Sequence, residues 1–212
     1  MAVRWALVGA FGLVVGVGLG ACSAEPTPTP NPVVQPGKPG EPNKTLSAEE
    51  AAAGVPVVPP NDADFDYAEM MIMHHQQAVE MTALAATRAV NTSVKGLASR
   101  IADTQRPEID MMNTWLERNG RAKVDPAHAG HHMHMTMPGI ATPEQLADLA
   151  AATGPAFDAL FLQLMIKHHE GAVEMAHVVQ KDGSDIKVQE MADHVIAEQT
   201  DEIKRMHTML AA

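Results

Sequence analysis

The chain has 212 residues, and 26 Asp and Glu against 15 Lys and Arg give it a formal net charge of −11. A phosphate-binding surface needs clustered Lys and Arg, so nucleic acid is not an expected partner. The single cysteine excludes an internal disulfide. Fifteen methionines stand against two Trp, one Tyr and four Phe, and they either fill a helical core or act as soft metal ligands.

Residues 1–21 are typical of a signal peptide. Arg4 supplies the positive charge ahead of an apolar run from Trp5 to Gly20, and Ala21 then precedes Cys22. Small residues before a cysteine at this point resemble a bacterial lipobox, in which the cysteine is diacylated. The run is short for a bilayer core of about 30 Å, which disfavours a membrane-spanning anchor. We therefore expect an extracytoplasmic protein, anchored to the cell membrane by lipid on Cys22.

Residues 22–60 are predicted to form a tether between this lipid and a folded domain. The segment is dominated by Pro, Thr, Gly and small residues, as in the alternation of Pro and Thr from Pro26 to Pro30. Such a composition has little to bury and favours a semi-extended chain.

Residues 61–212 contain an internal repeat with a constant offset of 94 residues. The matches run through two helical patterns and the loop between them, and include Asp64 with Asp158, Tyr67 with Phe161, His74 with His168, His75 with His169, Gln105 with Gln199 and Glu108 with Glu202. Each copy is therefore a helical hairpin, and neither could bury its apolar stripe alone. The two copies, residues 61–120 and 155–212, predict one all-α four-helix bundle.

Four long helices are expected at about 62–90, 93–119, 155–181 and 185–211. In the connecting segment, 125–154, Thr142 precedes Pro143 and Gln145 as an N-cap precedes a first-turn proline and a capping-box residue. This pattern predicts a short fifth helix before Gly154. Pro107 lies inside the second pattern and predicts a kink or a break near Arg106.

Each copy aims an adjacent His pair and a Met at one helix face. Met71 lies three and four residues before His74 and His75, and Met165 stands in the same relation to His168 and His169. The partner helices aim Gln and Glu at the same interior: Gln105, Glu108, Gln199 and Glu202. Two interpretations remain open here. These residues form a polar core layer, or the imidazoles hold metal with Gln and Glu behind them.

A carboxylate-bridged di-iron centre is disfavoured. Such a bundle site takes Glu three residues before His on two helices, whereas Met or Ile stands there before each member of the two pairs.

The connecting segment carries the strongest metal signal of the sequence. Within ten residues it holds four imidazoles and three thioethers, from His128, His131, His132, Met133, His134, Met135 and Met137. Imidazole suits Cu(II) and thioether selects Cu(I), so the mixture favours copper in either oxidation state. An incidental His-rich linker is the alternative, but alternating methionines in so polar a segment gain little from burial.

The pattern Asp-x-x-[Tyr/Phe]-x-x-x-Met-Ile-x-His-His-x-x-Ala-Val-Glu-Met, followed by Gln-x-x-Glu-Ile-x-x-Met, occurs in both copies. It resembles the bacterial family called domain of unknown function 305, from Asp62 to the C-terminus. The resemblance implies a ferritin-like four-helix bundle and an exported protein, since some members are described as periplasmic copper-binding proteins implicated in copper resistance. The family's motif residues fall here on His74, His75, His168, His169, Gln105, Glu108, Gln199, Glu202, Met71, Met112, Met165 and Met206. Ile140 and Ala141 replace further methionines that relatives often have.

The sequence thus predicts a copper-binding lipoprotein that sequesters or transfers copper, with a copper transporter or oxidase as a candidate partner. It favours a binding protein over an enzyme. Two alternatives stay open: a copper or iron oxidase of the ferritin-like class, and a structural envelope lipoprotein with a polar core layer.

Overall fold

The computed structural model describes residues 33–35, 42–54, 58–125 and 137–212. The predicted signal peptide, Cys22, and the loop residues His128, His131, His132, Met133, His134 and Met135 lie outside these ranges. The chain divides into two compact units, Met1–Pro56 and Val57–Ala212.

The first unit contains a small sheet and a short helix that the sequence did not lead us to expect. Strands β1 (Val33–Gln35) and β2 (Lys44–Leu46) pair antiparallel, with Val33 opposite Leu46. Helix α1 (Ala48–Ala53) begins at a capping box in which the Ser47 hydroxyl accepts from the Glu50 N–H and the Glu50 carboxylate accepts from the Ser47 N–H. The sheet and the helix are held by local contacts, because nearly all of their described side chains are exposed.

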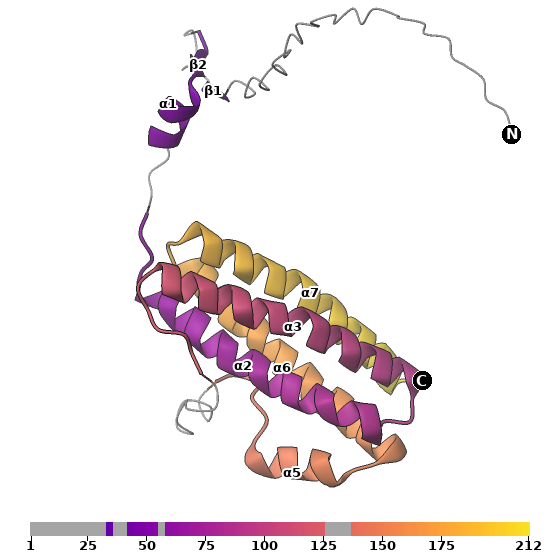
Figure 1. Cartoon of the computed structure of the whole chain (residues 1–212). Helices are drawn as coiled ribbons and strands as arrows, with labels where there is room; N and C mark the ends of the chain where they lie inside the picture. Colours follow the sequence, from indigo (N-terminus) through magenta and orange to yellow (C-terminus); the bar gives the residue numbers. More distant parts are fainter. Residues whose placement is uncertain (1–32, 36–41, 55–57, 126–136) are drawn as a thin grey trace, which may run out of the picture. The chain divides into compact units, whose positions relative to one another are not determined.

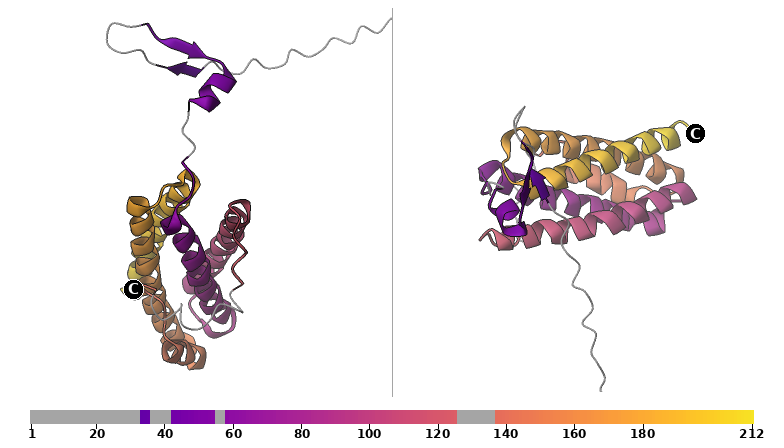
Figure 2. Two further views of the ribbon diagram at one scale, coloured as in Figure 1. Left: turned by 90° about the vertical axis from the view of Figure 1, so that its left-hand side faces the viewer. Right: turned by 90° about the horizontal axis from the view of Figure 1, so that it is seen from above.

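The second unit is the predicted four-helix bundle (Figure 1). Its helices are α2 (Asp62–Arg88), α3 (Thr92–Arg118), α6 (Gly154–Asp182) and α7 (Ile186–Leu210). Helix α2 packs on α3, α6 packs on α7, and α2 and α6 join the two hairpins (Figure 2). The predicted fifth helix is confirmed as α5 (Pro143–Ala151), which has the expected Thr142 capping box and contacts α2 and α6.

Of the kink or break expected near Arg106, the break is absent, because α3 continues through Pro107 as one helix. Proline removes the backbone donor that would reach the carbonyl of residue 103. Both Pro107 and Asp103 are exposed, so the missing bond falls on the solvent side of α3 and the helix can continue.

Two buried aspartates connect the hairpins at their turns. Asp64 at the start of α2 accepts hydrogen bonds from the backbone N–H groups of Ser184 and Asp185, in the turn of the other hairpin, at 3.0 and 3.1 Å. Its repeat counterpart Asp158 accepts from the N–H groups of Val90 and Asn91 at 3.2 and 2.9 Å. The motif aspartates are therefore reciprocal caps, each for the other copy's turn.

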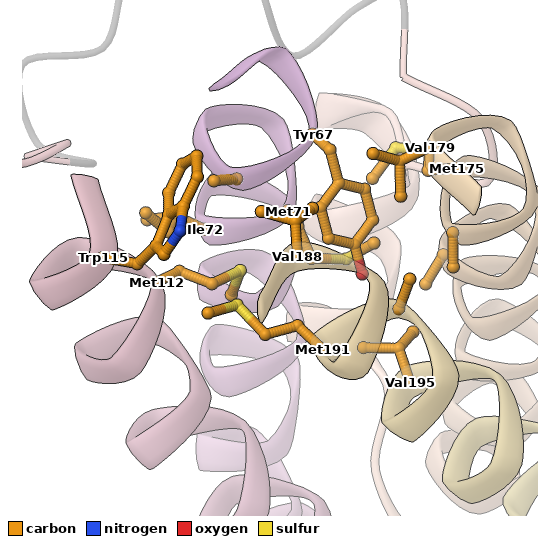
Figure 3. Close-up of a cluster of buried hydrophobic side chains, with 14 of the residues drawn as sticks. Tyr67, Met71, Ile72, Met112, Trp115, Met175, Val179, Val188, Met191 and Val195 are labelled. Carbon is orange, nitrogen blue, oxygen red and sulfur yellow. The ribbon is translucent and has the colours of Figure 1, made fainter. Parts of the chain in front are cut away.

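The core consists of two apolar clusters separated by a polar layer. One cluster gathers Tyr67, Met71, Trp115 and Met191 with their neighbours, and Figure 3 shows these side chains entering from α2, α3 and α7. The other contains Phe157, Phe161, Met165 and Met206. On each of the four helices the paired His residues, or Gln with Glu, fall between the segments that supply the two clusters. Among the described residues, no helix combines the length and the apolar character that crossing a membrane requires.

Candidate metal centre

Four imidazoles occupy the middle of the bundle. His74 and His75 from α2 and His168 and His169 from α6 are all fully buried. The rings of His74 and His168 face each other across the two helices, with centroids 3.8 Å apart. The central contact of the bundle is thus made by one imidazole from each repeat.

The outer imidazole of each pair is held by a carboxylate from the neighbouring helix. His75 Nε2 donates to Glu108 Oε2 at 2.7 Å, and His169 Nε2 donates to Glu202 Oε2 at 2.8 Å. An ionised carboxylate only accepts hydrogen bonds, so each Nε2 carries the proton. In the neutral ring the Nδ1 lone pair is then free, and both Nδ1 atoms are buried without a hydrogen-bond partner.

His74 is held by the connecting segment. Its Nε2 donates to the carbonyl oxygen of Pro138 at 3.0 Å, and its Nδ1 has no hydrogen-bond partner. Burial and the neighbouring imidazole of His75 lower the pKa of His74 to about 3, so the ring is neutral near pH 7. Burial, followed by the neighbouring histidines, also lowers the pKa of His168. Both ring nitrogens of His168 lack a hydrogen-bond partner.

The described end of the connecting segment is fixed beside these rings. Gln77 on α2 donates to the carbonyl of Ala141 at 3.0 Å and accepts from its N–H at 2.7 Å. On α6, the repeat counterpart of Gln77 is Gly171, where a Cβ would overlap the Pro138 carbonyl. Gly139 has φ +74°, a left-handed conformation that glycine adopts without strain. The two copies therefore differ at this position, where Gln77 and Gly171 hold the connecting segment from its two sides.

The donor set fits a metal ion in composition. Ligating histidines usually donate their other ring N–H to a carboxylate or a backbone carbonyl, which is the arrangement of His74, His75 and His169. Among the described residues, however, no three of the four imidazoles bring ring nitrogens within 4.8 Å of one another. Binding one ion with three of these rings would need them to move closer together.

The predicted polar layer is present, but several of its buried polar atoms have no hydrogen-bond partner. Gln105 and Gln199 are buried at the level of the imidazoles, yet Oε1 of each makes no hydrogen bond, and neither does Nε2 of Gln105. Buried polar atoms without partners each cost about 1–3 kcal/mol.

The predicted methionines lie in the apolar clusters next to this layer. Met71 and Met112 belong to one cluster and Met165 and Met206 to the other. Met137 is the last sulfur of the His/Met segment, which runs from His128 to Met137. It is buried in the cluster of Met71. The remaining candidates of that segment, from His128 to Met135, lie outside the described residues. One Glu-x-x-His spacing does occur, from Glu174 to His177, but both residues are exposed and lie away from the paired histidines.

One feature of this site, the contact of the Pro138 carbonyl, was missed by sequence reasoning. The Pro138 carbonyl is backbone and has no residue signature, and its position depends on the close approach of Gly139 to Gly171. The signal that could have found it is the change from Gln77 to Gly171 at matched positions of the repeat.

Comparisons with known proteins agree with this architecture. The family model of the domain of unknown function DUF305 matches residues 64–210. The chain belongs to this family. A DUF305 protein of Streptomyces coelicolor, named as secreted, is 35% identical, with 70% of this chain and 92% of that one covered and a TM-score of 0.63. A DUF305 fragment from Deinococcus radiodurans is 27% identical, with 73% and 99% covered and a TM-score of 0.65.

CopM in its Cu(II)-bound form is 32% identical to this chain, with 70% of this chain and 95% of that one covered and a TM-score of 0.59. CopM has also been solved in Cu(I)-bound, silver-bound and apo forms. A comparison with curated proteins gives no match.

Proposed function

We propose that this protein is an extracytoplasmic copper-binding lipoprotein that sequesters or hands over copper. The observation that carries the proposal is the arrangement of the buried imidazoles. In three of them Nε2 is engaged by Glu108, Glu202 or the Pro138 carbonyl, and Nδ1 is free. Imidazole nitrogen and the adjacent thioethers suit both oxidation states of copper, and CopM supports that assignment as a relative with copper-bound structures.

The His/Met segment is proposed as the first copper-binding part of the chain. Its described end contributes Met137 to the core and the Pro138 carbonyl to His74. Copper bound by the residues just before Met137 would therefore be only a few residues along the chain from the contact of Pro138 with His74. Lipid on Cys22 would keep the domain at the membrane, where a transporter or oxidase could receive the metal. The secreted relative supports the extracytoplasmic location.

The direct test is an anaerobic titration of the purified chain with Cu(I) against a chromogenic competitor. We expect binding tighter than micromolar. Replacing His131, His132 and His134 together by Ala should weaken the contribution of the segment. His74→Gln with His75→Gln should remove that of the bundle. His177→Gln is the matched control, because His177 is exposed on α6 and its loss should change nothing.

Three results would redirect the proposal. Affinity no tighter than micromolar in the unchanged chain would rule out copper sequestration. If His74→Gln with His75→Gln lowered only the melting temperature, the bundle histidines would be a polar layer and the protein could be a structural envelope lipoprotein. Oxygen uptake by the metal-loaded protein would instead favour the copper or iron oxidase.

The carboxylates offer a finer test of the bundle. Glu108→Gln and Glu202→Gln keep the side-chain shape but remove the charge that orients His75 and His169. Loss of such an outer partner lowers metal affinity by roughly 10–100-fold. Equal losses would indicate that both repeats contribute, whereas loss in one variant alone would assign the metal to one His pair.

A further inference from the structure

A second cluster of metal-ligating side chains lies between α3 and α7, outside the His pairs. It consists of Glu108, His194 and Glu198, whose ligand atoms all lie within 4.8 Å of one another. His194 and Glu198 were not candidates from the sequence. A search of the described residues for three His, Cys, Asp or Glu side chains with ligand atoms this close together gives this group.

The two distances from His194 to the carboxylates match those of a tetrahedral site. Glu108 Oε1 is 3.5 Å from His194 Nε2, which is 3.4 Å from Glu198 Oε2. Ligand atoms about 2.1 Å from a tetrahedral ion are about 3.4 Å apart. His194 is largely exposed and Glu198 partly so, so both side chains can adjust around an ion and a fourth position can face water.

Glu108 points a free oxygen into this cluster. The residue is only 7% exposed, and Oε2 is occupied by His75. Its Oε1 is buried and has no hydrogen-bond partner, since 3.5 Å to His194 is too long for one. An ion at Oε1 would leave the bond to His75 intact.

The electrostatic surroundings favour a cation. Burial and then the neighbouring carboxylates of Glu108 and Glu202 raise the pKa of Glu198. Three carboxylates thus repel one another at this level of α3 and α7, and a bound divalent ion would offset that repulsion.

The repeat supplies an internal comparison. Glu202 is the counterpart of Glu108, but Arg100 and Thr104 stand where the other side has His194 and Glu198. Arg100, Thr104 and Glu202 line a groove of about 260 Å³ together with Glu198. Arginine is always charged and is not a metal ligand in proteins, so the matching position around Glu202 lacks the ligand set.

We propose that Glu108, His194 and Glu198 form a surface metal site that takes a divalent first-row cation such as Zn(II), and not Cu(I). One imidazole nitrogen and two carboxylate oxygens suit Zn(II) and its neighbours, while Cu(I) prefers sulfur. The site shares no imidazole or thioether with the proposed copper site; the two meet only at Glu108, whose Oε2 holds His75 and whose Oε1 faces this cluster.

The test is calorimetric titration with Zn(II) of the full chain in which His128, His131, His132 and His134 are replaced by Ala, so that the segment cannot contribute. Adding His194→Ala with Glu198→Gln should remove one bound ion, or weaken it by roughly tenfold or more. His177→Gln, added instead, should remove none. Helicity measured by circular dichroism should stay unchanged, because the two replaced residues are at the surface.

A second variant tests the same inference by gain of function. Arg100→His with Thr104→Glu, beside Glu202, should add one Zn(II) per chain. Unchanged Zn(II) binding after His194→Ala with Glu198→Gln would overturn the site. The Cu(I) titration should be the same with and without His194→Ala and Glu198→Gln in the chain that carries the four His→Ala changes, so failure of this site and failure of the copper function are distinguishable.

Discussion

The two hairpins repeat the same polar layer but differ wherever the connecting segment or the solvent reaches it. Both place a His pair against a Glu of the neighbouring helix, at 2.7 Å in one copy and 2.8 Å in the other. They diverge at Gln77 and Gly171, which hold the connecting segment from its two sides. Matched residues therefore build the buried centre, and unmatched residues determine how it is reached.

The largest expected effect is a loss of stability at low pH, which compares the buried histidines of the two copies. Histidine in the unfolded chain has a pKa near 6.5, whereas that of folded His74 is about 3. As pH falls below 6.5 the unfolded state takes up protons that the folded state does not, so the stability present above pH 6.5 is lost progressively. Between pH 7 and pH 5 we expect metal-free protein to lose about 2 kcal/mol for His74, and His168, whose pKa is also lowered by burial and by the neighbouring histidines, should add to this loss.

Urea unfolding at the two pH values measures this loss. His168→Gln should reduce the pH dependence and leave the part due to His74. A stability that stayed flat between pH 7 and pH 5 would contradict the neutral, buried state of these rings.

The reciprocal caps offer a second way to compare the copies. Asp64→Ala removes the acceptor for two N–H groups of the other hairpin's turn and for the Ser184 hydroxyl. We expect a loss of about 3 kcal/mol, and about 2 kcal/mol for Asp158→Ala, which has fewer donors. Urea midpoints with unchanged slopes would give both values. Losses below 0.5 kcal/mol, roughly those of a surface change, would rule out a capping role.

The smallest expected effect concerns Gly171, the position where the second copy departs from Gln77 of the first. Gly171→Ala places a Cβ against the Pro138 carbonyl and the Gly139 N–H, so it should cost about 1–3 kcal/mol and displace the segment from His74. Gly96→Ala is the control, because its Cβ would meet only the end of Arg100 at 3.7 Å. That change should stabilise the protein by about 0.5 kcal/mol. Equal effects in thermal unfolding would mean that the segment is not packed against α6.

Much of this fold could be predicted because it depends on local periodicity and on the repeat. The inward faces of the four helices, the order of the hairpins and α5 all follow from patterns within one or two turns. Helix α1 could also have been found, since Ser47 and Glu50 have the spacing of a capping box. The uninterrupted α3 could not, because tolerance of Pro107 depends on which side of the helix faces water.

The candidate site was harder to predict, because its contacts join residues far apart in the sequence. The partners of the His pairs were expected from the aligned faces of the helices, and Glu108 and Glu202 hold the predicted places. The contact of His74 with Pro138 and the approach of His194 to Glu108 depend on how the hairpins cross. No spacing within one helix encodes such a contact.

The exchanged aspartate caps also say what one hairpin would lack by itself. Without Asp158 the N–H groups of Val90 and Asn91 lose their acceptor, and without Asp64 those of Ser184 and Asp185 do. A hairpin made alone could regain these bonds only by pairing with a second one about a twofold axis. The domain thus resembles a dimer of two hairpins joined in one polypeptide, in which matched positions such as Gln77 and Gly171 can carry different residues.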